Sequence, residues 1–200
     1  MYFNKENYGQ NVQYLEGMKS NKKNDRIAEY FALYANEADA FCRLGMEIDY
    51  DQSGQGVIET LLLDKLEFRN GSVHVLNTIT KNLDMKAVSE EFLFLTEAVA
   101  ASGVDVLVHP FRIFCRNGLT LPRHLFLPTV DILKRYGTAV ELNYHTNEPP
   151  AEFFQMCIEN DIELSLGSDA HNLYEVGELY GHLKFLHKIA PDFDLSTLKH

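Results

Sequence analysis

Hydrophobic positions along the chain alternate between helix-like spacing and short continuous runs. The pattern predicts helices over residues 26–44, 57–66, 85–102, 122–136, 151–159 and 174–189. Strands are predicted over 46–49, 68–76, 104–108, 139–143 and 162–166, the second of them broken at Asn70-Gly71 and resumed at Ser72. Strand and helix therefore alternate five times, which predicts parallel strands joined by right-handed crossovers.

We predict a barrel-like α/β fold rather than an open doubly wound sheet. The run 104–108 is almost continuously apolar, as in strands that are buried on both faces of a parallel sheet. Side chains that can bind metals stand at the ends of several predicted strands, where barrel enzymes carry their chemistry. Neither GxGxxG nor GxxxxGK[ST] occurs, so dinucleotide and nucleoside triphosphate binding have no support.

Length and composition limit the classes of protein to consider. We predict a polar N-terminal arm over 1–25 and one metal-binding α/β domain over 26–200, since 200 residues with 46% apolar content suit a single core. A net charge of −11 argues against nucleic-acid partners. No apolar run approaches the ~20 residues that cross a bilayer, so no membrane association is expected. Three widely spaced cysteines fit a reducing compartment, and we predict a cytoplasmic location.

The sequence Gly167-Ser168-Asp169-Ala170-His171 carries the strongest chemical signal. In extended chain Asp169 and His171 project to the same side, because side chains alternate along a strand. A carboxylate and an imidazole held together form half of a site for a divalent transition metal. Three other strand-like segments hold Glu47, His74 and His109, each at a comparable place. Together these residues predict a metal-dependent enzyme.

At five motifs the chain resembles the PHP (polymerase and histidinol phosphatase) family. The motifs occur in the family's order and are GMEIDY at 45–50, GSVH at 71–74, VLVHP at 106–110, VELN at 140–143 and GSDAH at 167–171. The resemblance implies a distorted seven-stranded (β/α) barrel, here N-terminally incomplete with about five β/α units. It further implies up to three divalent zinc, manganese or iron ions that cleave a phosphate ester, most similarly to histidinol-phosphatase-type phosphomonoesterases.

The resemblance also implies a role for each matched residue. Glu47 would bridge two metals, His74 and His109 would complete the second site, Asp169 would bind the first metal and His171 the third. The family opens with an HxH strand, whereas this chain has no histidine before His74. We therefore expect fewer metals than three, with Glu47, His74 and His109 as the one complete site.

Two explanations of the missing HxH strand stay open at this point. The chain is either an N-terminally truncated version of a longer phosphatase or a natural short form. In both cases a barrel without its first units exposes strand edges, which have to be covered or paired. We expect the arm over 1–25, or a second copy of the chain in a homo-oligomer, to cover them.

The predicted function is hydrolysis of a small phosphorylated metabolite by a metal-activated water, with Glu47, His109 and Arg112 as catalytic residues. Arg112 would clamp a phosphate oxygen, or it is an ordinary solvated arginine. His145 would bind substrate, or it is a plain loop histidine. The remaining histidines, His182 among them, are expected to be solvated.

Three other functions are considered. An amidohydrolase-type enzyme usually needs a lysine at mid-chain, and no predicted strand ends in one. A DNA-processing PHP module is disfavoured by the acidic charge. A catalytically impaired remnant that binds metal or acts as a scaffold is the main alternative, because several family ligands are missing.

Overall fold

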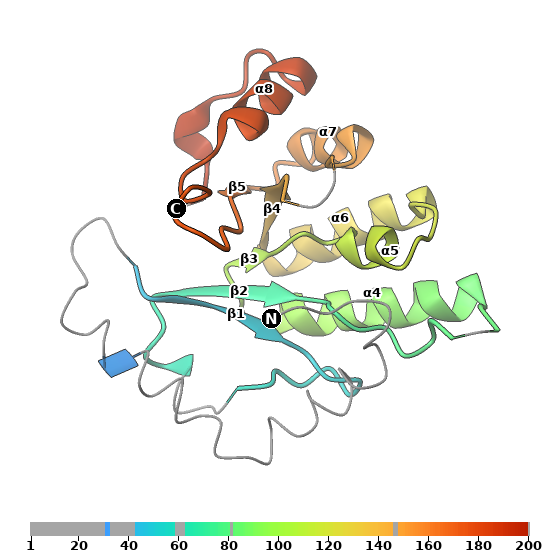
Figure 1. The fold of residues 1–200 in the computed structure, drawn as a ribbon. Helices are drawn as coiled ribbons and strands as arrows, with labels where there is room; N and C mark the ends of the chain where they lie inside the picture. Colours follow the sequence, from blue (N-terminus) through green and yellow to red (C-terminus); the bar gives the residue numbers. More distant parts are fainter. Residues whose placement is uncertain (1–30, 33–42, 59–62, 81, 146–147, 200) are drawn as a thin grey trace. The chain divides into compact units, whose positions relative to one another are not determined.

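A computed structural model describes the chain except for residues 1–30, 33–42, 59–62, 81, 146–147 and 200 (Figure 1). The chain divides into two compact units, Met1–Asp105 and Val106–His200. The predicted arm over 1–25 lies outside the described residues, and so does most of the helix predicted over 26–44. The division into an arm and one domain over 26–200 stays a prediction.

The first unit contains two parallel strands, β1 (Gly45–Asp49) and β2 (Phe68–Ser72), and the helix α4 (Met85–Ala101). The carboxylate of Asp84 accepts a hydrogen bond from the Lys86 backbone N–H and caps the start of α4. Gly103, at a φ of +79°, follows the end of the helix, as predicted. α4 packs against β2 (Figure 1) and buries one face, which includes Val88, Phe92, Leu95 and Val99.

The predicted break of the second strand at Asn70-Gly71 is wrong, because β2 runs through both residues and ends at Ser72. A Cβ atom on Gly71 would lie 2.4 Å from Val99 Cγ1, so the glycine is there for the close approach of α4 rather than for a turn. Residues 73–76, predicted as strand, form a loop that carries His74.

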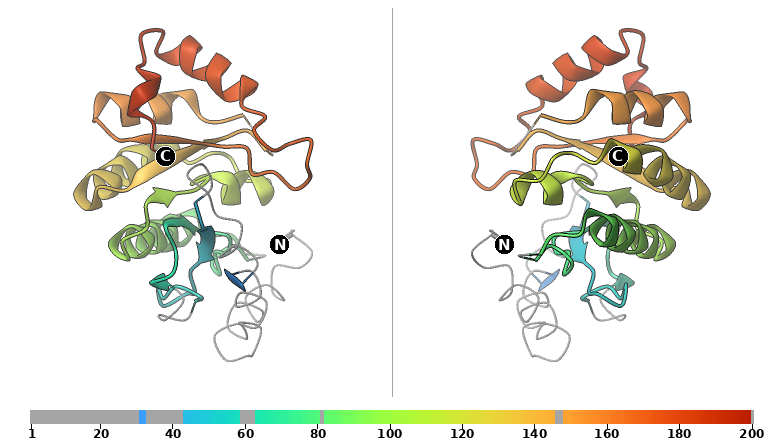
Figure 2. Two further views of the ribbon diagram at one scale, coloured as in Figure 1. Left: turned by 90° about the vertical axis from the view of Figure 1, so that its left-hand side faces the viewer. Right: turned by 90° about the vertical axis from the view of Figure 1, so that its right-hand side faces the viewer.

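The second unit contains three strands, β3 (Val106–Leu107), β4 (Ala139–Asn143) and β5 (Leu164–Gly167), each paired in parallel with its neighbour. Its helices are α5 (Arg112–Arg116), η2 (Arg123–Leu125), α6 (Phe126–Tyr136), α7 (Ala151–Glu159), α8 (Tyr180–Ile189) and η3 (Leu195–Thr197). All five residues of β4 are buried, including the polar Glu141 and Asn143. α6 and α7 lie side by side (Figure 2).

An aromatic cluster forms much of the core of the second unit. Phe111 contacts Phe126 and Phe153 with ring centroids 5.0 and 4.9 Å apart. Phe153 also contacts Phe154, which packs on Phe185 of α8. All five rings are buried, so the helices of this unit are fixed around a common core.

The predicted α/β fold with parallel strands is confirmed, while closure of a barrel and the number of its units stay predictions. The helices predicted over 122–136 and 151–159 are confirmed, whereas α8 begins at Tyr180 rather than at residue 174. Part of the helix predicted over 57–66 lies outside the described residues. The short helix α5 was not predicted. In the part of the chain that the structure describes, no helix has the length and apolar content needed to cross a membrane.

Candidate metal centre

In the first unit, the ends of the two parallel strands bring four polar side chains together. Glu47 and Asp49 alternate along β1 and therefore share a face. His74 follows the end of β2, and its Nε2 lies 3.2 Å from Glu47 Oε1. The Nδ1 atom of the same ring contacts Asp49 Oδ1, which also accepts a hydrogen bond of 2.9 Å from Ser72 Oγ.

This arrangement fits a divalent cation. The contact with Asp49 places the proton of His74 on Nδ1 and turns Nε2 towards Glu47, which is the way that metal-ligating histidines are usually oriented. A nitrogen and an oxygen that bind the same tetrahedral zinc ion lie about 3.4 Å apart, close to the observed 3.2 Å. Asp49 was not among the predicted site residues, although it stands two residues after Glu47 on the same strand.

In the second unit, His109 stands two residues after the end of β3 in a backbone conformation that is rare for residues other than glycine, with a φ of +33°. Glu141 of β4 stabilises this conformation, because its Oε2 accepts a hydrogen bond of 2.9 Å from the His109 backbone N–H. Both residues are buried. A Cβ atom on Gly167 would lie 1.7 Å from Glu141 Oε1, so the glycine that opens the GSDAH motif leaves room for this carboxylate.

Arg112 is buried rather than solvated, with 5% of its side chain exposed. One terminal nitrogen donates to Asp169 Oδ2 at 2.5 Å, and the other donates to Asn143 Oδ1 at 2.5 Å. With His109 and other residues, Arg112 lines a cavity of about 20 Å³, which is room for about one water molecule. Both terminal nitrogens thus hold protein groups, so the guanidinium ties the ends of β4 and β5 together.

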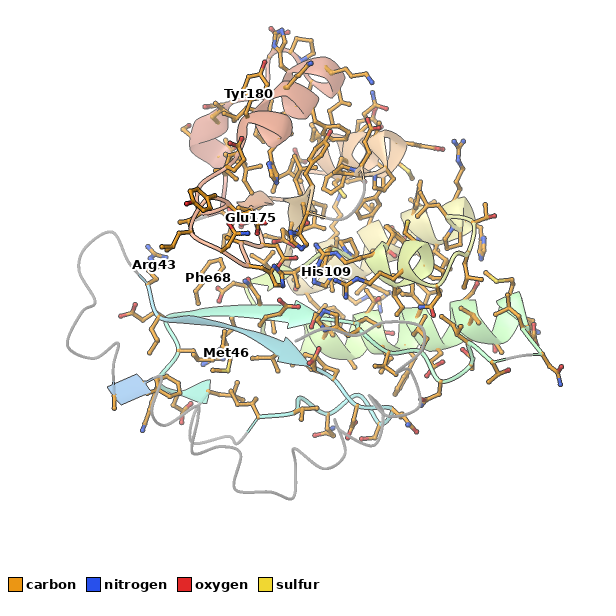
Figure 3. The ribbon with its side chains drawn as sticks, viewed as in Figure 1. Arg43, Met46, Phe68, His109, Glu175 and Tyr180 are labelled. Atoms are coloured by element: carbon orange, nitrogen blue, oxygen red, sulfur yellow. The ribbon has the colours of Figure 1, made fainter. Side chains whose placement is uncertain are left out.

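The GSDAH motif leaves β5 at Gly167, and Asp169 and His171 lie in the following loop. His171 Nδ1 contacts the backbone carbonyl of Asp169 at 2.7 Å, and its ring stacks on His145 with centroids 4.5 Å apart. Glu175 follows in the same loop, as Figure 3 shows. Donor atoms of His145, His171 and Glu175 all lie within 4.8 Å of one another.

The structure thus brings the predicted site residues together in three groups. Glu47 lies with His74, Arg112 lies with Asp169, and His145 lies with His171. The prediction that His109 joins Glu47 and His74 in one site involves residues of both units and stays a prediction. The predicted metal and substrate roles of the other residues also stay predictions. The sequence analysis did not identify Glu175 as a candidate ligand, although it lies only four residues after His171 in the sequence.

The prediction that His182 is solvated is wrong. The ring is 3% exposed, its Nε2 donates to the Gly167 carbonyl at 2.9 Å, and it packs on the Tyr144 ring. Burial lowers the pKa of His182, although the hydrogen bond to Gly167 and the charge of Glu178 act in the opposite direction. A neutral His182 therefore anchors the start of the GSDAH motif to α8.

Comparison with models of protein families and with curated proteins gives no match to the sequence. Among solved structures, the chain is similar to histidinol phosphate phosphatase from Lactococcus lactis subsp. lactis Il1403, determined in complex with zinc, L-histidinol and phosphate. The TM-score is 0.50 at 14% sequence identity, and the match covers 83% of this chain and 72% of that one. This chain therefore shares the fold of a histidinol phosphate phosphatase, which confirms at the level of the fold the resemblance carried by the five motifs.

Proposed function

We propose that the chain is a metal-dependent phosphoesterase that hydrolyses a phosphate monoester of a small metabolite. The observation that carries the proposal is the Asp49–His74–Glu47 arrangement, in which one carboxylate orients an imidazole towards a second carboxylate. The fold shared with a phosphatase that binds zinc, histidinol and phosphate supports the reaction class. Zinc, manganese and iron all accept such an imidazole and carboxylate donor set.

The chain's own residues divide the work as follows. Glu47 and His74 would hold the cation, and the addition of His109 to this donor set stays a prediction. Bound there, a divalent cation supplies Lewis acidity towards a phosphoryl oxygen and activates a water as nucleophile. Asp49 keeps the proton of His74 on Nδ1, so that the Nε2 lone pair is directed at the cation.

The groups around His109 have positioning roles in this proposal. Glu141 holds the backbone of His109 in its strained conformation, and Gly167 leaves space for the Glu141 carboxylate. Arg112 secures Asp169 and Asn143 at the ends of β5 and β4. Contact of Arg112 or His145 with a substrate phosphate remains a prediction, and for Arg112 it requires a rearrangement, because the cavity beside it holds about one water.

An impaired remnant that binds metal is the second candidate, and one observation favours it. Asp169, expected as a ligand of the first metal, is paired with the Arg112 guanidinium, which already neutralises its charge. A cation beside that guanidinium would be repelled. The enzyme proposal therefore depends on Glu47, His74 and His109 rather than on Asp169.

Metal-dependent turnover separates the two candidates. Protein purified in the presence of Zn²⁺ or Mn²⁺ should hydrolyse an aryl phosphate if it is a working phosphatase, whereas a remnant should bind the metal without turnover. Glu47→Gln and His74→Ala should each lower the metal content by about one equivalent. His187→Ala, which changes an exposed histidine of α8, is the matched control and should leave it unchanged.

A further inference from the structure

We propose that His145, His171 and Glu175 form a second divalent-cation site, built entirely within the second unit and selective for zinc-like ions. His145 follows β4, whereas His171 and Glu175 belong to the segment between β5 and α8, where Figure 3 labels Glu175. Two imidazoles and one carboxylate are a donor set that zinc and other late first-row metals prefer, whereas Mg²⁺ and Ca²⁺ prefer oxygen ligands alone. This site shares no residue with the Glu47–His74 centre.

The three side chains are close enough to bind one ion after a small movement. Their donor atoms lie within 4.8 Å of one another, and two donors on a tetrahedral zinc lie about 3.4 Å apart. The imidazole rings of His145 and His171 are nearly parallel, with an interplanar angle of 19°. A contraction of about 1.5 Å or less would bring the three donor atoms to these distances.

Hydrogen bonds direct the donor atoms of His171 and Glu175. A carbonyl oxygen can only accept, so the contact between His171 Nδ1 and the Asp169 carbonyl fixes the proton on Nδ1 and leaves the lone pair on Nε2. Glu175 accepts hydrogen bonds from the His171 backbone N–H at 2.7 Å and from Asn172 Nδ2 at 2.6 Å.

Arg112 holds the two loops that carry these ligands. Asn143 Oδ1 accepts from both Arg112 and the His145 backbone N–H, which fixes the start of the first loop. Asp169, whose carboxylate accepts from Arg112, presents its carbonyl to His171 in the second loop. A single buried guanidinium thus sets the spacing of His145 and His171.

Cobalt binding tests the site without any reference to enzymatic activity. The double variant Glu47→Gln/His74→Ala removes the first centre, so that failure of the proposed function does not affect the outcome. Titrated with Co²⁺ and followed by visible absorption, it should bind one equivalent. Adding His145→Ala, His171→Ala or Glu175→Gln should each weaken this binding at least tenfold, and adding His187→Ala should not. Absence of cobalt binding, or binding that none of the three changes weakens, would overturn the proposal.

A second measurement applies if the double variant does not fold. The same three substitutions, made one at a time in the otherwise unaltered chain, should each reduce the bound cobalt by one equivalent at a fixed Co²⁺ concentration. Circular dichroism establishes that each variant is folded. Folded variants that retain the full cobalt content would contradict the site.

Discussion

His74 and His171 are oriented by their surroundings in the same way, although they lie in different units. Each ring uses Nδ1 for a contact with a protein oxygen, the Asp49 carboxylate in one case and the Asp169 carbonyl in the other. The Nε2 atom of His74 lies beside Glu47, and a ring nitrogen of His171 lies within 4.8 Å of a Glu175 carboxylate oxygen. In both cases the contact determines which ring nitrogen carries the proton before an ion binds.

The Asp49 carboxylate should therefore control metal affinity without binding the ion itself. We expect Asp49→Asn to weaken Zn²⁺ binding by about 10- to 100-fold, the usual effect of removing a partner that orients a ligating histidine. Isothermal titration calorimetry measures the change. Asp51→Asn is the control on the same segment, since Asp51 caps a turn through Ser53 and Gln55. Equal affinity in the Asp49 variant and the unaltered protein would contradict this role.

His182 should make stability depend on pH. Its pKa is lowered on folding, so the unfolded chain takes up a proton near its ordinary pKa of 6.5 while the folded chain resists it. Stability is complete above this value and is lost as the pH falls below it, by at most about 1.4 kcal/mol per pH unit. His182→Gln should show a shallower loss of unfolding free energy between about pH 7 and pH 5.5 in urea titrations. An identical slope in His182→Gln and in the control His187→Gln would refute the prediction.

At the scale of elements, the close packing of β2 on α4 depends on the absence of a side chain at Gly71. Gly71→Ala would place a Cβ atom 2.4 Å from Val99 Cγ1, and relieving that overlap should cost about 1–3 kcal/mol of unfolding free energy. Gly45→Ala is a matched control in β1, because its nearest neighbour would lie at 3.4 Å. Chemical denaturation of both variants measures the difference. Similar stability of the two would show that α4 moves away freely.

The ends of β4 and β5 are joined through Arg112, and breaking this link should be costly. We expect Asp169→Asn to lower the unfolding free energy by about 3–5 kcal/mol, since it leaves a buried guanidinium without its ionic partner. The same variant should keep its metal content at the Glu47–His74 centre. Loss of one metal equivalent, in a variant of unchanged stability, would mean instead that Asp169 is a metal ligand.

The elements and their chemistry were predictable from the sequence to different degrees. Helix α4 and strand β4 follow directly from apolar spacing and flanking residues, and the structure confirms both. Gly71 was misread as part of a break in the strand because its role, the close approach of Val99, is tertiary and leaves no local pattern in the sequence. His182 was misread for the same reason, since its partner Gly167 is 15 residues away.

At the scale of the whole molecule, the proposed function joins a fold with a cluster of side chains that could bind a metal. The chain shares its fold with a phosphatase that binds zinc, and its first unit holds a carboxylate-oriented histidine beside a second carboxylate. In the proposed function, a bound cation would also favour a phosphorylated substrate, because a net charge of −11 on the chain disfavours anions. Association of the chain into a homo-oligomer stays a prediction.

The central claim is metal-dependent phosphoester hydrolysis, and phosphate release from an aryl phosphate tests it most directly. After removal of metals by chelation, the protein should be inactive, and Mn²⁺ or Zn²⁺ should restore turnover. Activity should be lost in His74→Ala and His109→Ala and kept in His187→Ala. Absence of turnover with every divalent metal, or turnover that survives both chelation and His74→Ala, would contradict the account.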